Sequence, residues 1–198
     1  LCNAAGPTNG KIVLRDGKTE PKSVAIVHCV GSRDKNHNEY CSGICCMASL
    51  KQATYVRAAL PNAKIRIFAI DIRTPGRLED FYTKVREDPN VSIERGKVAR
   101  IDEIDGQLRL QVEDTLGDKI QDVYADLVVL ATGMEPSIRR DPLPFDIRQD
   151  EDHFGITDVA TGLIVAGCAK RPFGVSDSVQ DATGAALRAI QCQAGRSE

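Results

Sequence analysis

The chain has 198 residues, 42% of them hydrophobic, and its 26 Lys and Arg against 28 Asp and Glu give a formal net charge of -2. This length suits one large globular domain or two small ones, and the balanced charge argues against nucleic acid as a partner. The longest apolar runs, within residues 126–134 and 162–169, are far below the roughly 18 residues of a membrane span. We therefore expect contact with a membrane only through other proteins.

The first part of the chain predicts a strand, a helix and a second strand. Residues 23–28 (SVAIVH) are apolar and β-branched, residues 44–60 carry apolar side chains at helical spacing, and residues 64–72 alternate apolar and polar residues. A turn at 74–76 precedes a short helix. This βαβ pattern indicates an α/β fold with a parallel sheet and a right-handed crossover.

A meander of short strands is predicted next, from four segments at 91–95, 97–105, 108–115 and 119–126. Hairpin turns are expected at 105–107 and 116–118. Residues 126–136 (DLVVLATGMEP) then predict a buried strand that enters a glycine turn. After Pro136 we expect a polar connector of about twenty residues, a strand at 162–167, and a helix with Ser176 or Asp177 as its N-cap.

Seven cysteines without a secretory signal point to a reducing compartment, the cytoplasm, and to metal or redox use. Cys29, Cys41, Cys45 and Cys46 lie within the eighteen residues CVGSRDKNHNEYCSGICC, whereas Cys2, Cys168 and Cys192 stand alone as small buried or incidental residues. Zinc sites usually use paired C-x2–4-C knuckles. Adjacent cysteines on a helix diverge by about 100°, which favours a larger iron–sulfur cluster. Zinc and redox or incidental thiols remain the alternatives.

The same stretch lacks the phosphate-binding glycines of a dinucleotide fold. Between Cys29 and Cys46 only Gly31 and Gly43 occur, and no G-x-G-x-x-G motif is present. We therefore expect weak or no binding of NAD(P)H. A nicotinamide-dependent disulfide reductase that uses a cysteine pair is the competing hypothesis, and it predicts nicotinamide binding.

Three segments carry a family resemblance: CVGSRDKNHNEYCSGICCMASLKQA, LVVLATGMEPS and GLIVAGCAKRPFGVSDSVQDATGAA. They resemble the iron–sulfur flavoprotein that is the A subunit of heterodisulfide reductases. RTPGRLEDFYTKV and PFGVSDSVQDATGAALRAIQ resemble more closely the homologous A or B flavoprotein subunit of the quinone-interacting membrane-bound oxidoreductase, the electron-transfer partner of adenylylsulfate reductase. The resemblance covers nearly the whole chain.

The resemblance implies a Rossmann-like, thioredoxin-reductase-like fold for FAD and NAD(P) binding, in three layers with an antiparallel β-meander, present as a fragment. Residues 1–22 would connect domains, residues 23–136 would form a nucleotide-binding-like domain, and residues 137–198 a linker and the C-terminal part of the FAD-binding domain. The FAD-anchoring G-x-G-x-x-G motif would precede residue 1.

The resemblance also implies the cofactors and their ligands. A [4Fe-4S] cluster would be bound through Cys29, Cys41, Cys45 and Cys46. FAD contacts would fall on Thr132, Gly133 and Met134, on Gly167, Cys168 and Ala169, and on Asp177, Ser178 and Val179, with Cys168 at the position where the wider class has an Asp.

The implied function is that of an oxidoreductase subunit that passes electrons between FAD and the cluster to partner subunits in a complex of sulfur metabolism. Adenylylsulfate reductase is the specific partner implied, with a cytoplasmic location or one peripheral to the inner membrane through partners. The fragment alone is expected to be inactive. A structural or docking module whose four thiolates hold zinc is the alternative from a different class.

Overall fold

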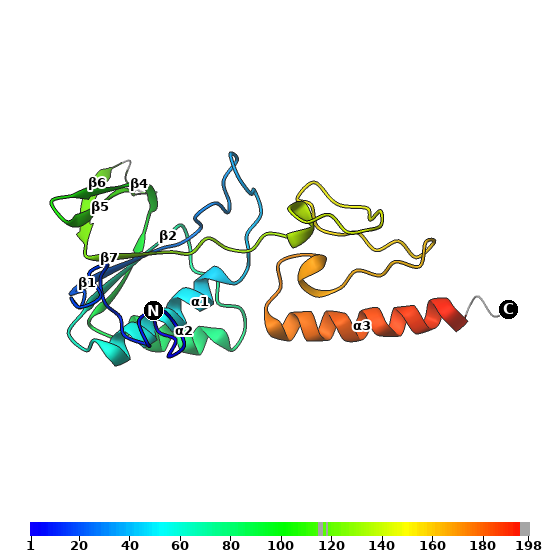
Figure 1. Ribbon diagram of the computed structural model, residues 1–198, viewed down its shortest axis with the longest axis horizontal. Helices are drawn as coiled ribbons and strands as arrows, with labels where there is room; N and C mark the ends of the chain where they lie inside the picture. Colours follow the sequence, from blue (N-terminus) through cyan, green and yellow to red (C-terminus); the bar gives the residue numbers. More distant parts are fainter. Residues whose placement is uncertain (115–116, 118, 195–198) are drawn as a thin grey trace. The chain divides into compact units, whose positions relative to one another are not determined.

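The computed structural model describes residues 1–114, 117 and 119–194 (Figure 1). The chain divides into two units. The first unit comprises Leu1–Val30 and Cys45–Thr132, and the second comprises Gly31–Ile44 and Gly133–Glu198. The predicted turn at 116–118 falls mainly outside the described residues.

A four-stranded parallel sheet forms the centre of the first unit (Figure 1). Its order is β3-β2-β1-β7, with β1 at Ser23–Val27, β2 at Lys64–Ala69, β3 at Val91–Arg95 and β7 at Leu127–Leu130. The register pairs Val24 with Ile65 of β2 and with Leu127 of β7. Since β1 lies between β2 and β7, its backbone groups have partners on both sides, which suits its apolar sequence.

Alternate residues of β1 face two different apolar layers. Val24 and Ile26 pack with residues of helices α1 (Cys45–Ala59) and α2 (Leu78–Arg86), including the fully buried Leu50. Ala25 and Val27 pack on the opposite face against an antiparallel meander. The period-two alternation of a strand thus produces both cores, and it yields the predicted three-layer arrangement.

The meander has three strands, β4 (Lys97–Ile104), β5 (Gln107–Glu113) and β6 (Ile120–Ala125). The predicted turn at 105–107 joins β4 to β5, with Asp105 and Gly106 both at positive φ. One expectation is wrong, because residues 91–95 do not belong to the meander. They form β3, which pairs parallel with β2, since the chain returns from β2 through α2 in a βαβ crossover.

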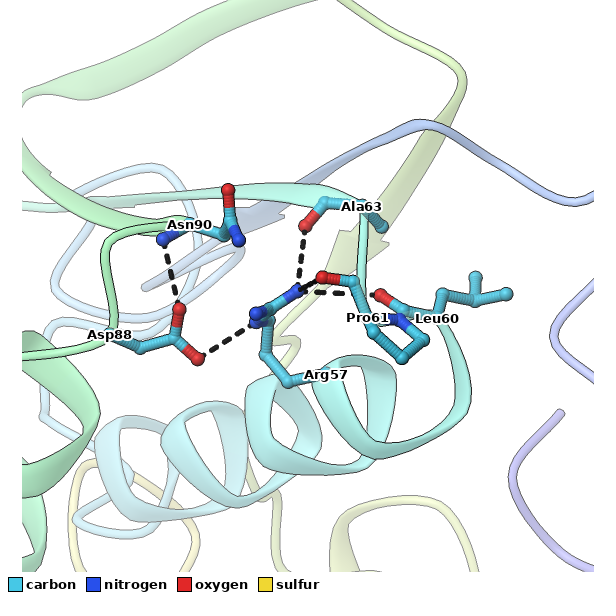
Figure 2. A network of polar contacts seen from close by, with 6 residues as sticks. All are labelled: Arg57, Leu60, Pro61, Ala63, Asp88 and Asn90. Carbon is cyan, nitrogen blue, oxygen red and sulfur yellow. Dashed lines mark hydrogen bonds and ion pairs between the residues drawn. The ribbon is translucent and has the colours of Figure 1, made fainter.

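A polar network closes the C-terminal end of α1 (Figure 2). Arg57 donates to Asp88 at 2.8 Å, and its guanidinium also donates to the carbonyl oxygens of Leu60, Pro61 and Ala63. Asp88 in turn accepts from the backbone N–H of Asn90 at 2.9 Å. One side chain of the last turn of α1 thus binds the carbonyl groups of the turn that follows the helix and connects them to the turn before β3.

The second unit contains little regular structure before its long helix. It consists of the loop 31–44, two short 3-10 helices at Ser137–Arg139 and Gly167–Ala169, and α3 at Val175–Ala194. The strand expected at 162–167 does not form. A strand needs neighbours for its backbone groups, and among the described residues Leu163 pairs only through an isolated bridge with Asp158.

The start of α3 also differs from the sequence prediction. The helix begins at Val175, so neither Ser176 nor Asp177 is its N-cap. Instead the backbone N–H of Ser178 donates to the carbonyl of Gly174 at 2.9 Å, which makes Asp177 a residue of the first turn. Among the described helices, none combines the length and apolar composition that a bilayer crossing requires.

Candidate functional site

Three of the four clustered cysteines belong to the first unit, where β1 ends and α1 begins. Cys29 follows β1 after one residue and adopts a left-handed backbone conformation with φ 56°, so the chain turns away from the strand there. Cys45 and Cys46 are the first two residues of α1. In a parallel strand–helix unit the carboxyl end of the strand and the start of the helix lie at one edge of the sheet, where such folds place their ligands.

Backbone groups already surround the Cys46 sulfur. It accepts a hydrogen bond from the backbone N–H of Arg73 at 3.4 Å, and the thiol donates to the carbonyl oxygen of Asp71 at 3.9 Å. Both residues follow β2 at the same edge of the sheet. The Asp71 carbonyl pairs with the thiol, whereas the N–H of Arg73 is a donor that a sulfur bound to a metal would also accept from.

Two buried polar side chains lie beside these cysteines in sequence. Both ring nitrogens of His28 and the hydroxyl of Ser49 have no hydrogen-bond partner within the described part of the chain. Burial lowers the pKa of His28 to about 4, so the imidazole is neutral at pH 7. Buried polar groups normally have partners. Both residues are close to the cysteines in the chain, since His28 precedes Cys29 and Ser49 lies one turn after Cys45 in α1.

Cys41 belongs to the second unit, in the loop 31–44, which we term the cysteine loop. The backbone N–H of Gly43 donates to its sulfur at 3.4 Å. Within the described residues, no group of three or more His, Cys, Asp or Glu side chains is arranged to hold a metal ion. The set of Cys29, Cys41, Cys45 and Cys46 therefore remains a prediction from the sequence.

The predicted flavin contacts at the glycine turn contact the cysteine loop. Thr132 is exposed and is the last residue of the first unit. Gly133 has φ 83°, and the backbone of Met134 is hydrogen-bonded to Ser42 and Tyr40. Sequence reasoning missed these two residues, because a serine and a tyrosine in a polar loop carry no distinctive pattern.

Burial and charge keep the Tyr40 hydroxyl protonated. Its pKa is raised, first by burial and then by the nearby carboxylates of Glu135, Asp152 and Asp150, which outweigh the opposing effect of Arg139. The hydroxyl is therefore a donor at neutral pH, consistent with its bond to the Met134 carbonyl.

The second set of predicted flavin contacts surrounds the start of α3. The Gly167–Ala169 turn is held by Asp181, which accepts from the backbone N–H of Gly167 at 2.9 Å and from Lys170 at 2.7 Å. The Cys168 sulfur lies 3.6 Å from the Ser178 hydroxyl. Asp177 and Val179 lie in the exposed first turns of the helix. A glycine turn against a helix N-terminus fits the phosphates of a dinucleotide.

A cavity of about 360 Å³ opens at the carboxyl ends of β2 and β3. Its walls include Ile72, Tyr82 and Ile93, and its charged lining residues are Asp71, Glu94 and Arg95. It borders the segment that contacts the Cys46 sulfur, because Asp71 takes part in both. The cavity thus adjoins the cysteine-bearing edge of the first unit.

The sequence comparisons match the chain to A subunits of heterodisulfide reductases. It is 36% identical over 205 residues to the A subunit of the ferredoxin/F(420)H(2)-dependent CoB-CoM heterodisulfide reductase of Methanosarcina acetivorans, covering 96% of this chain and 26% of the relative. It is 34% identical to the A subunit of the H(2):CoB-CoM heterodisulfide,ferredoxin reductase of Methanothermobacter thermautotrophicus, covering 96% and 31%.

A third relative is named as an iron-sulfur protein. The second iron-sulfur A subunit of the CoB–CoM heterodisulfide reductase of Methanopyrus kandleri is 35% identical over 205 residues, covering 96% of this chain and 31% of the relative. The chain thus spans between about a quarter and a third of these relatives. No protein-family model matches it.

Solved structures agree on the fold. Lactococcus lactis thioredoxin reductase has a TM-score of 0.57 at 12% identity, over 86% of this chain and 52% of that protein. LpdA of Mycobacterium tuberculosis has a TM-score of 0.54 at 10% identity, over 98% and 40%. These likenesses confirm the thioredoxin-reductase-like α/β fold predicted from the sequence.

Proposed function

Because the chain belongs by homology to the family of heterodisulfide reductase A subunits, of which it spans a segment, we propose that it is part of an oxidoreductase subunit in electron transfer. Its role is to hold a [4Fe-4S] cluster near FAD and to relay electrons to partner subunits. The cofactors supply the redox chemistry, and the chain sets their positions and potentials.

The observation that carries the proposal is the placement of cysteines where a nucleotide fold normally binds phosphate. Cys29 follows the end of β1 after one residue, and Cys45 and Cys46 are the first residues of α1, at the edge where a G-x-G-x-x-G turn would otherwise lie. The N–H of Arg73 already donates to one of these sulfurs. Hydrogen bonds of this kind stabilise iron–sulfur clusters and raise their reduction potentials.

We assign Cys41 as the fourth ligand from its position in the chain. It lies four residues before Cys45, within a loop that contains Gly, Ser and Asn and can adjust to a cluster. The Methanopyrus kandleri relative is named an iron-sulfur subunit, which supports a cluster in this family.

FAD is the second proposed cofactor, with Gly167, Cys168 and Ala169 against the start of α3 as its main contacts in this chain. Asp177, Ser178 and Val179 lie in the first turns of that helix, and Thr132, Gly133 and Met134 complete the proposed set. The partners we propose are other subunits of an electron-transfer complex of sulfur metabolism, with adenylylsulfate reductase as the specific candidate. We place the protein in the cytoplasm, peripheral to the inner membrane through those partners.

Iron and acid-labile sulfide counts on anaerobically purified protein test the cluster. We expect about four of each per chain, from the stoichiometry of a [4Fe-4S] centre, and absorption near 400 nm that bleaches with dithionite. Serine variants at Cys29, Cys41, Cys45 and Cys46 should each lose iron. Cys2→Ser and Cys192→Ser are the matched controls and should keep it.

Two other results would redirect the assignment. A colourless protein with one zinc per chain would support the docking-module alternative and exclude electron transfer by this segment. Saturable binding of NADPH or NADH, measured by titration, would favour the cysteine-pair disulfide reductase instead.

A further inference from the structure

The cysteine loop is attached to the segment after β7 on both sides of Cys41. The Tyr40 hydroxyl donates to the carbonyl oxygen of Met134 at 2.8 Å, and the Met134 N–H donates to the Ser42 hydroxyl at 3.0 Å. The two chain neighbours of Cys41 thus bind the two backbone polar groups of one residue. The backbone on either side of the thiol is fixed at these two points.

Further contacts extend the attachment along the loop. Asn38 donates to Glu135 at 3.1 Å and accepts from Arg139 at 3.1 Å. The Tyr40 ring meets Phe154 edge to face, with centroids 5.2 Å apart, and Phe154 is only 2% exposed. The loop therefore has an apolar anchor as well as polar ones.

The loop is also internally ordered. The N–H of Arg33 donates to the carbonyl of Tyr40, and the N–H of Asn38 donates to the carbonyl of Gly31. Ser32 and Ser42 share a hydrogen bond of 2.8 Å, and their exposed fractions are 2% and 1%. A buried hydroxyl without a hydrogen-bond partner destabilises the fold. A different conformation of this loop would leave the two hydroxyls unpaired and is therefore disfavoured.

Gly133 is shaped to receive this loop. Its backbone has φ 83°, and a Cβ added there would overlap the Ser42 hydroxyl and lie 2.7 Å from that of Ser32. A side chain at position 133 would therefore occupy the space of the two serines. The glycine of the ATG turn is required for seating the cysteine loop, independently of any flavin.

We propose that Tyr40 and Ser42 are positioning residues that clamp Cys41 to Met134, so that its thiolate is presented as a cluster ligand. The role of Cys41 as a ligand rests on the proposed function, whereas the clamp itself rests on the contacts above. Met134 is also one of the proposed flavin contacts, so the clamp links one proposed cluster ligand to one proposed flavin contact within the second unit.

The first experiment measures the clamp without any cofactor. Metal-free protein is treated with iodoacetamide, and alkylation of each cysteine is followed by mass spectrometry. We expect Tyr40→Phe and Ser42→Ala each to raise the Cys41 alkylation rate about fivefold, the effect of one lost hydrogen bond. The rate at Cys168 should stay unchanged. Tyr55→Phe and Ser176→Ala, at exposed positions, are the matched controls.

The proposed clamp would be wrong if the variants kept the parent circular dichroism spectrum and Cys41 were alkylated at the parent rate. A general loss of structure would instead raise alkylation at the buried Cys46 as well. Since the two substitutions are tested singly and remove only a hydroxyl, at least one variant is expected to retain the fold.

The second experiment separates the clamp from the proposed function. In anaerobic protein that contains the cluster, Tyr40→Phe and Ser42→Ala should accelerate bleaching near 400 nm under a chelator by a similar factor, with parent iron content before the challenge. Unchanged bleaching would mean that the clamp does not present a ligand. If the unmodified protein contained no iron, the proposed function would be wrong. The alkylation experiment would still test the clamp, because it uses metal-free protein.

Discussion

Gly133 and Ser42 lie so close that a Cβ on the glycine would overlap the serine hydroxyl. Gly133 belongs to the turn after β7, and Ser42 comes from a loop some ninety positions earlier in the chain, so the contact holds two distant segments of the second unit together. A side chain at position 133 would have to displace the hydroxyl oxygens of Ser42 and Ser32.

Gly133→Ala should destabilise the protein by roughly 2–5 kcal/mol, from the left-handed backbone and the overlap with Ser42 together. Gly106→Ala is the matched control: Gly106 also has positive φ, at 78°, but a Cβ there meets nothing within 4 Å. It should lose only about 1 kcal/mol. Thermal and urea unfolding of both variants would check this, and equal losses would show that the overlap is relieved without cost.

Arg73 contributes a backbone N–H to the Cys46 sulfur, which allows a test that leaves the cysteines intact. Arg73→Pro removes the donor, whereas Arg73→Ala keeps it and removes only the side chain. In protein that contains the cluster, we expect the proline variant to have the lower reduction potential, because a hydrogen bond to sulfur stabilises the more negative reduced state.

A potentiometric titration followed by absorption measures this difference. If the alanine variant shifted the potential as far as the proline variant, the guanidinium charge rather than the N–H would be the cause. Circular dichroism spectra of both variants would show whether the protein keeps its fold after the substitution.

Arg57→Met should lower the free energy of unfolding by about 2 kcal/mol, as expected for hydrogen bonds to a charged group. The variant keeps the aliphatic part of the side chain but leaves the carbonyl oxygens of the turn after α1 and the Asp88 carboxylate without this donor (Figure 2). Lys51→Met, an exposed change on the same helix, is the control. A loss of stability equal to that of the control would contradict the network's role.

Glu94 makes stability depend on pH. Its carboxylate accepts two hydrogen bonds of 2.7 Å from Arg66, and this pairing holds the pKa of Glu94 below its usual 4.5. The unfolded chain then binds the proton more readily than the folded one. The stabilisation is present above pH 4.5 and is lost as the pH falls through the lower pKa of the folded state.

Melting temperatures between pH 7 and pH 3 would show this contribution. Glu94→Gln should cost about 1 kcal/mol at pH 7 and converge with the parent in acid. Glu79→Gln, at an exposed position of α2, should run parallel to the parent at every pH. A constant gap between Glu94→Gln and the parent would indicate lost packing rather than lost charge pairing.

The sequence by itself determined the main elements of the first unit. Short apolar runs such as residues 23–28 and 126–131 predict strands without any information from the rest of the chain. The helix that begins at Cys45 follows from the local spacing of apolar residues. The fold class and the family resemblance follow for the same reason, since periodicity and cysteine spacing are properties of neighbouring residues. Both are confirmed by the relatives and the solved structures.

Only the tertiary structure decided how segments distant in the chain meet. β3 joins the parallel sheet because a crossover helix returns it beside β2, and residues 162–167 form no strand because no described strand lies beside them. The seating of Tyr40 and Ser42 on Met134 depends on residues more than ninety positions apart. Such contacts depend on which backbone group lies next to a buried hydroxyl in the folded chain, and a local sequence pattern does not contain that information.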